Sequence, residues 1–157
     1  MKEPYVWVFF YGSYINFDVL KEVDLVPPRW EVARIMGFDI EIAPRANLVR
    51  ADQRVAYGIV AQATHSQLVR LYSHAKDVLG EVYLPEAVIV QTLDEKWIPA
   101  MAYLCPEMEP RQADEAYVER IAAPAAKFGF PRWYIDRIDS FRPSRAQSYK
   151  GPLRPEP

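Results

Sequence analysis

The residues with the clearest chemical potential lie near the N-terminus, at Tyr11, Gly12, Ser13 and Tyr14. The apolar, aromatic run of residues 8–10 leads directly into them, and a helix-compatible segment follows. A strand that ends at such a turn leaves backbone N–H groups unpaired, and a helix start adds partial positive charge. We therefore expect the N–H groups of Gly12, Ser13 and Tyr14 to bind an anion such as a carboxylate. The other interpretation is an ordinary strand-ending turn, with glycine present for its conformational freedom.

The remaining polar residues give weaker signals. His65 and His74 are the two histidines of the chain, and their spacing does not place them on one helix face, so no metal site is expected. Ser13 and His74 could form a nucleophile–base pair, but the sequence identifies no third residue to orient the histidine. Arg45 and Arg50 lie in a polar stretch and are the first candidates to bind a second carboxylate. Otherwise they are solvated surface charges.

Runs of apolar and β-branched residues predict the strands that position these side chains. Residues 5–11 are continuously apolar or aromatic, as in a strand buried on both faces, and residues 30–42 alternate between apolar and polar. Further strands are expected over residues 54–63, 82–92 and 97–105, the last two as a hairpin. Residues 44–53 are polar and are predicted to form a loop.

The expected helices lie between and after these strands. Thr64 and Gln67 have the spacing of a capping box, in which each side chain bonds the other residue's backbone N–H. Leu68, Leu71 and Ala75 then follow at helical spacing, which predicts an amphipathic helix. Other helices are expected over residues 16–23, 113–128 and 131–141, and residues 78–81 are read as a connection.

The mixed order of these elements indicates an α+β fold, with a small mixed β-barrel-like sheet of five to six strands and peripheral helices. A chain of 157 residues fits one domain with a single core. We place this domain at residues 1–142. Residues 143–157 are polar and rich in proline, and we expect them to form a loosely ordered tail.

Bulk composition excludes several classes of function. The net charge is -2 and there is no long basic run, so no nucleic-acid partner is expected. No stretch approaches the ~18 apolar residues of a membrane span. The single cysteine, Cys105, excludes an internal disulfide and a cysteine-based zinc site, and its apolar surroundings predict a core thiol. Because the N-terminus lacks a signal-peptide pattern, a soluble cytoplasmic protein is expected. These patterns do not predict the oligomeric state.

Four segments, in this order, resemble the γ-glutamylcyclotransferase-like family, which includes the γ-glutamylamine cyclotransferases and AIG2-like plant proteins. Residues 8–13 are similar to the family's first strand and its Tyr-Gly-Ser loop, and residues 32–38 to its second strand. Residues 56–60, with the capped helix that reaches Leu71, resemble a third segment. Residues 117–141 resemble the family's C-terminal helices. The match covers nearly the whole chain.

The resemblance implies a cofactor-free enzyme that releases 5-oxoproline from a γ-glutamyl small molecule. The Tyr-Gly-Ser loop would hold the α-carboxylate of the substrate. A glutamate with a raised pKa would take a proton from the α-ammonium, and the freed amine would attack the γ-carbonyl and close a five-membered lactam. The same acid would then protonate the leaving amine. The expected partner is thus a γ-glutamyl-type small molecule.

The resemblance also assigns tyrosines to the pocket. Tyr83 matches a family tyrosine that lies near the substrate, and Tyr103, on the same expected hairpin, is a second candidate to line the pocket. Packing within the barrel, with a hydrogen-bonded hydroxyl, is the alternative for both. Tyr14 stands where the family has a small asparagine.

The family's catalytic glutamate has no direct counterpart in this chain. Aligned from the preceding helix, its position holds Ala75, and aligned backward from Tyr83, it holds Lys76. Glu81 and Asp77 are the nearest acids, and either could act as the acid/base if the loop after the helix brings it to the pocket. Two hypotheses follow. The chain is a cyclotransferase that uses Glu81 or Asp77, or it is a non-catalytic relative that binds a small carboxylate ligand or a partner.

Overall fold

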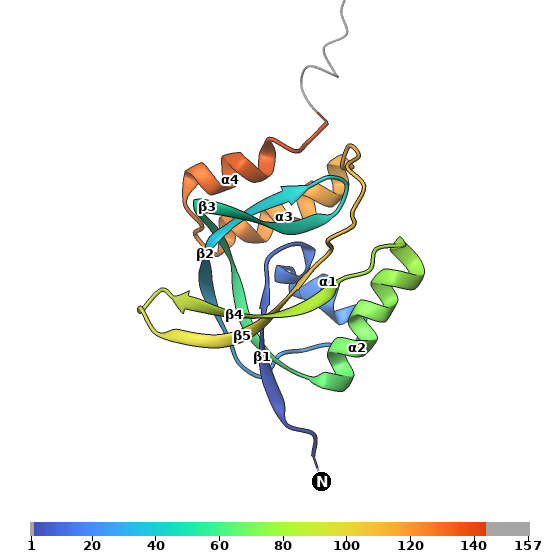
Figure 1. Ribbon diagram of the computed structural model, residues 1–157, viewed down its shortest axis with the longest axis vertical. Helices are drawn as coiled ribbons and strands as arrows, with labels where there is room; N and C mark the ends of the chain where they lie inside the picture. The colour runs from blue at the N-terminus through green and yellow to red at the C-terminus, as the bar shows by residue number, and fades with distance from the viewer. Residues whose placement is uncertain (1, 144–157) are drawn as a thin grey trace, which may run out of the picture.

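A five-stranded β-barrel organises the computed structural model, which describes residues 2–143 (Figure 1). The strands are β1 (Tyr5–Phe10), β2 (Trp30–Ile42), β3 (Ala46–Thr64), β4 (Leu84–Thr92) and β5 (Trp97–Leu104). The barrel is closed in the order β1-β3-β2-β4-β5, and β5 returns to β1. All strand pairs are antiparallel except β1 with β5. The expected mixed, barrel-like sheet is confirmed, with five strands.

Helices surround the barrel, which confirms the α+β class. They are α1 (Phe17–Lys21), α2 (His65–His74), α3 (Glu115–Lys127) and α4 (Arg132–Asp139), with the 3-10 turn η1 (Ser13–Ile15) and the π-helical turn η2 (Ala75–Leu79). Figure 1 shows α3 and α4 together at one end, with α3 behind the long hairpin of β2 and β3, whereas α2 lies along another side. None of the helices in residues 2–143 is long and apolar enough to cross a membrane. The tail expected over residues 143–157 lies, except for Pro143, outside the described residues.

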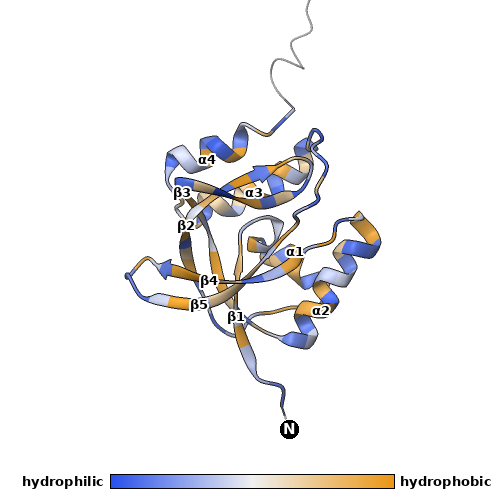
Figure 2. Ribbon diagram, viewed as in Figure 1, coloured by the Kyte–Doolittle hydropathy of each residue, from blue (hydrophilic) through white to orange (hydrophobic). Residues whose placement is uncertain are grey.

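Strand β1 forms the centre of the core. It pairs with β3 on one edge and with β5 on the other, and Val8, Phe9 and Phe10 are buried. Burial on both faces explains why this strand reads as a continuous apolar run instead of an alternating one. Figure 2 shows hydrophobic residues along the barrel strands and a mixture of hydrophobic and hydrophilic residues along α2. Because β1 is buried and is paired along both edges, it holds the start of the loop that follows it in place.

The start of α2 agrees with the sequence prediction. The Thr64 hydroxyl accepts a hydrogen bond from the Gln67 N–H at 3.1 Å, and the Thr64 N–H donates to the Gln67 side chain at 2.8 Å. This capping box satisfies two backbone groups that an uncapped helix would leave unpaired. Leu68, Leu71 and Ala75 are buried, as their spacing predicts.

The sequence predicts a loop over residues 44–53, and this prediction is wrong from residue 46 onward. Strand β3 begins at Ala46, and residues 46–50 pair with β2, from Ile42 opposite Ala46 to Phe38 opposite Arg50. Backbone pairing extends this part of the hairpin, while polar side chains occupy its exposed positions. Leu48 is buried in the core, but the short apolar pair Leu48-Val49, with Asn47 before it and Arg50 after it, is too weak a pattern to predict a strand.

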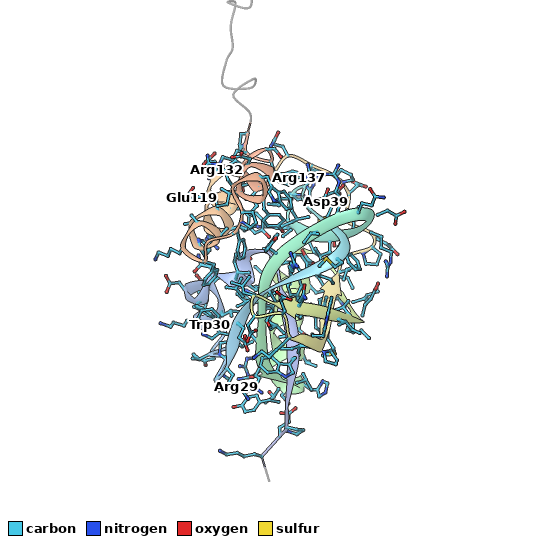
Figure 3. All side chains as sticks on the ribbon, turned by 90° about the vertical axis from the view of Figure 1, so that its left-hand side faces the viewer. Arg29, Trp30, Asp39, Glu119, Arg132 and Arg137 are labelled. Carbon is cyan, nitrogen blue, oxygen red and sulfur yellow. The ribbon has the colours of Figure 1, made fainter. Side chains whose placement is uncertain are left out.

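Two contacts hold the first part of β3 in place. The Asn47 side-chain amide donates to the carbonyl of Cys105 at 2.8 Å, and its oxygen accepts from the Cys105 N–H at 2.9 Å. Cys105 is buried, as expected of a core thiol. From the other side, Arg137 of α4 bonds Asp39 of β2 at 2.9 Å, and both are labelled at the same end of the molecule in Figure 3.

Gly58 marks the closest approach of β1 and β3. A Cβ at this position would lie 2.0 Å from the carbonyl oxygen of Phe10 and 3.0 Å from the Phe9 ring. Because a backbone oxygen cannot move aside without separating the strands, Gly58→Ala is expected to lower the free energy of unfolding by about 1–3 kcal/mol or more. Denaturant unfolding followed by circular dichroism measures this change. An unaltered midpoint would contradict the close approach.

Candidate functional site

A pocket opens where the end of β1, the start of β3 and the end of α2 meet. We call it the tyrosine pocket, because five of its twelve lining residues are tyrosines. Its empty volume is about 400 Å³, including space open to solvent. The lining residues are Phe10, Tyr11, Gly12, Ser13, Tyr14, Arg45, Ala46, Tyr72, Ala75, Leu79, Tyr83 and Tyr117. The structure therefore brings residues 11–14 and Tyr83 together, as the sequence predicts, and adds residues from α2 and α3.

Tyrosine hydroxyls fix the backbone around this pocket. Tyr11 donates a hydrogen bond to the carbonyl of Tyr103 at 2.5 Å, which ties the loop after β1 to β5. Tyr83 donates to the carbonyl of Ala46 at 2.6 Å, and Tyr117 accepts from the Ala46 N–H at 2.9 Å. The two backbone groups of Ala46 are thus held by side chains from opposite walls.

Gly12 allows the loop to lie directly against the start of β3. A Cβ on Gly12 would lie 2.4 Å from the Cβ of Ala46, so a larger residue here would push the loop away from the strand. The requirement is for space, since φ at Gly12 is -110°. This close contact sets the position of the loop relative to Arg45 and Ala46.

The loop presents backbone N–H groups, as expected from the sequence. The carbonyls of Gly12 and Ser13 accept hydrogen bonds from residues 15 and 16, but within residues 2–143 no backbone acceptor pairs with the N–H groups of Gly12, Ser13 and Tyr14. The following segment differs from the expectation of a helix over residues 16–23. It is a 3-10 turn and a five-residue helix, too short for a strong macrodipole.

Burial keeps the pocket phenols protonated. Loss of solvation raises the pKa of every tyrosine that lines the pocket above the usual value, and repulsion from neighbouring phenols adds to the effect for most of them. Arg45 opposes this rise only partly, at Tyr14 and Tyr117. The phenols are therefore neutral groups at neutral pH, able to donate hydrogen bonds but not to act as bases.

Arg45 is the charged residue of the tyrosine pocket. Its guanidinium carbon lies 4.9 Å from the centre of the Tyr117 ring, a cation–π distance. Within residues 2–143, no carboxylate lies within salt-bridge distance of Arg45. Arg50, the other candidate cation, is paired with Glu86 on the surface instead. Arg45 is thus available to a ligand carboxylate.

Ala75 lies in the wall of the tyrosine pocket, almost fully buried. It follows the last residue of α2 and begins η2. This is the residue that aligns with the family glutamate, so the position faces the expected ligand but offers only a methyl group. Among the described residues, no aspartate or glutamate lines the pocket.

The structure places the two candidate acids outside the tyrosine pocket. Asp77 is exposed and lines neither this pocket nor its neighbour. Glu81 is 9% exposed and lines an adjoining cavity of about 590 Å³, including open solvent. Arg45, Leu79 and Tyr117 line both spaces and form the boundary between them. The left-handed Gly80 (φ 77°) directs the chain from η2 to Glu81.

The other candidate residues from the sequence lie outside the tyrosine pocket. Tyr103 does not line the tyrosine pocket, but its ring stacks on Tyr72 at 3.9 Å between centres. His74 is exposed and does not line the pocket with Ser13. Among residues 2–143, no group of three or more potential metal ligands comes together.

Sequence reasoning did not assign Tyr72 and Tyr117 to the site. Both lie on the apolar stripes of helices, where aromatic residues usually indicate core packing. The signal that could have found Tyr72 is its spacing, because it lies one helical turn before Ala75 on the same face.

Comparison with solved structures identifies the fold. An uncharacterized human protein is similar to this chain with a TM-score of 0.75 at 21% identity, covering 95% of this chain and 93% of its own. A γ-glutamyl cyclotransferase has a TM-score of 0.73 at 21% identity over 94% and 92%. A mouse AIG2-like protein has a TM-score of 0.53 at 15% identity over 68% and 80%. No protein-family model and no curated protein matches the sequence. The chain has the γ-glutamylcyclotransferase-like fold that its sequence resemblance predicts.

Proposed function

We propose that this protein binds a small carboxylate ligand in the tyrosine pocket without using the cyclotransferase acid/base of the family. One observation carries the proposal. Ala75 stands in the pocket wall beside the Tyr11–Tyr14 loop, and no carboxylate of the described residues lines that pocket. The groups that recognise a carboxylate are present, whereas the group that would remove a proton from an α-ammonium is not.

The proposed ligand contacts follow from the lining. The N–H groups of Gly12, Ser13 and Tyr14 and the guanidinium of Arg45 supply donors to a carboxylate. The neutral hydroxyls of Tyr14 and Tyr72 add uncharged donors, since those of Tyr11 and Tyr83 already donate to backbone carbonyls, and the aromatic rings cover the apolar part of a small ligand. The site needs no cofactor or metal for this role.

Arg45→Gln is expected to weaken binding of a small carboxylate such as 5-oxoproline by about tenfold to a hundredfold, since a charge-assisted hydrogen bond contributes ~1.5–3 kcal/mol. Isothermal titration calorimetry with 5-oxoproline measures the effect. Arg50→Gln is the matched control, because Arg50 lies in β3, five residues after Arg45, but is paired with Glu86 and does not line the pocket. Equal losses in both variants would show that the effect is general surface charge.

A second candidate function is cyclotransferase activity with Glu81 as the acid/base. The observation that favours it is the burial of Glu81 in a cavity bounded by Arg45 and Tyr117, which also line the tyrosine pocket. A substrate that extends across this boundary would bring its amine toward Glu81.

A 5-oxoproline release assay with γ-glutamyl amino acids and γ-glutamylamines separates the two functions. The binding proposal expects no release above background. If release is observed, Glu81→Gln is expected to reduce it by about 10²–10⁴-fold, as removal of a general base does, whereas the exposed Asp77→Asn serves as the control. Release that survives both substitutions would rule out the two candidate acids.

A further inference from the structure

We infer that the tyrosine pocket selects carboxylates that carry no ammonium group beside the carboxylate. The inference rests on the proposed function, that the pocket binds a carboxylate, and it specifies the chemical class of that ligand. A lactam or amide nitrogen, which is neutral, fits this class. A free α-amino acid, which carries both charges, does not.

The charges of the pocket wall carry this inference. Arg45 is positive, and the wall contains no carboxylate among the described residues. The N–H groups of residues 12–14, which line the same pocket, pair with no backbone acceptor within residues 2–143 and add partial positive charge. A ligand ammonium bound here would lie near Arg45 without a carboxylate partner, and a buried, unpaired charge is costly.

Aromatic faces offer a ligand ammonium little compensation. Arg45 already covers the ring of Tyr117, at 4.9 Å from its centre. One face of Tyr72 is stacked on Tyr103, and Tyr14 meets Tyr72 edge to face at 5.7 Å. These three rings are thus engaged with other rings or with Arg45, so they replace a missing carboxylate poorly.

Neutral nitrogen groups fit the same wall better. An amide N–H needs only a neutral acceptor, which a tyrosine hydroxyl or a backbone carbonyl provides. The raised pKa values of the pocket tyrosines keep these hydroxyls protonated and uncharged. The ligand carboxylate keeps Arg45 and the loop N–H groups as its partners.

Three probes that share a carboxylate and an amide test this selectivity on the unmodified protein. They are 5-oxoproline, glutamine and 4-carbamoylbutanoate, which is glutamine with hydrogen in place of its ammonium. By calorimetry, we expect the two ammonium-free probes to bind about tenfold to a hundredfold more tightly than glutamine. The open-chain probe separates the effect of the ammonium from the effect of the ring.

The outcomes distinguish this inference from the proposed function. Equal or tighter binding of glutamine would overturn the selectivity and leave carboxylate binding intact. Failure of all three probes to bind at millimolar concentration would overturn both. Ala75→Glu adds a carboxylate to the wall and is expected to shift the preference toward glutamine, while Ala75→Gln, of the same size, is expected not to.

Glu81 and Asp114 line the adjoining cavity, beyond the boundary formed by Arg45, Leu79 and Tyr117, and are the alternative partners for an ammonium. Glu81→Gln and Asp114→Asn therefore complete the test. We expect each to leave the affinity for glutamine within about twofold of the unmodified protein, because both carboxylates line the adjoining cavity and not the tyrosine pocket. A selective loss of glutamine affinity in either variant would show that the substituted acid holds the ammonium and would overturn the inference.

Discussion

Ala75→Glu is expected to raise the rate of 5-oxoproline release from a γ-glutamyl amide by about 10²–10⁴-fold, the usual contribution of a general acid/base. The substitution places a carboxylate at the one wall position of the tyrosine pocket that the family resemblance assigns to a glutamate. The carboxylate would extend from the end of α2 toward the Tyr11–Tyr14 loop.

The surroundings of residue 75 suit this role. Ala75 is 1% exposed, so a glutamate there would enter a partly desolvated space between tyrosine rings. Desolvation raises the pKa of a carboxyl group, which lets it accept a proton from an ammonium and return it to the leaving amine.

Ala75→Gln is the matched control for this experiment, because it has the size of glutamate but cannot take the proton. We expect the glutamine variant to remain at the background rate of the unmodified protein. The measurement is product release under steady-state conditions, with ligand binding checked separately. A glutamate variant that binds the γ-glutamyl compound but releases no product would show that the bound γ-carbonyl lies out of reach of residue 75.

The barrel could be predicted from sequence because its strands are buried. Residues 5–11 and 30–42 carry patterns that only a strand explains, and the Thr64–Gln67 capping box marks the start of α2. The first part of β3 could not be predicted, since residues 46–53 mix apolar and polar side chains without a clear alternation, and backbone pairing with β2 holds residues 46–50. A hydrophobic pattern in the sequence indicates which side chains are buried, but it does not indicate which backbone segments pair.

The candidate site likewise has a part that the sequence predicts and a part that it does not. The Tyr11–Tyr14 loop could be predicted because a strand ends abruptly at a glycine. Tyr72 could have been found from its spacing to Ala75, but Tyr117 could not, because it reaches the pocket from α3, whose placement depends on the whole fold. The position of Glu81 also depends on geometry that the sequence hides, namely a π-helical turn at Ala75–Leu79 followed by a left-handed Gly80.

The buried phenols predict a steep loss of stability in alkali. Desolvation raises the pKa of Tyr11, Tyr72 and Tyr117 in the folded protein, and the same cause acts on other tyrosines of the pocket. In the unfolded chain a phenol titrates near its ordinary pKa of about 10. Below that pH both states are protonated and stability is unaffected. Above it the unfolded chain loses protons that the folded protein retains, so unfolding becomes easier as pH rises toward the folded pKa.

The expected size of this effect is large. Each phenol that is ionised only in the unfolded chain lowers the free energy of unfolding by about 1.4 kcal/mol per pH unit. Three such residues would remove about 4 kcal/mol per unit, against a typical total of ~5–15 kcal/mol for a domain. We therefore expect the protein to unfold between about pH 10 and pH 13. Denaturant unfolding at successive pH values, followed by circular dichroism, measures the slope, and absorbance near 295 nm reports tyrosinate.

Tyr72→Phe separates this linkage from general alkaline damage. Within residues 2–143 the Tyr72 hydroxyl makes no hydrogen bond, and its ring stacks on Tyr103, a contact that phenylalanine preserves. The variant should therefore match the unmodified protein near pH 8, yet lose stability above pH 10 less steeply, by about 1.4 kcal/mol per pH unit. If the two slopes coincide, the Tyr72 phenol ionises as readily in the folded protein as in the unfolded chain. The tyrosine pocket would then be more hydrated than its packing indicates, and its hydroxyls would be weaker donors to a ligand.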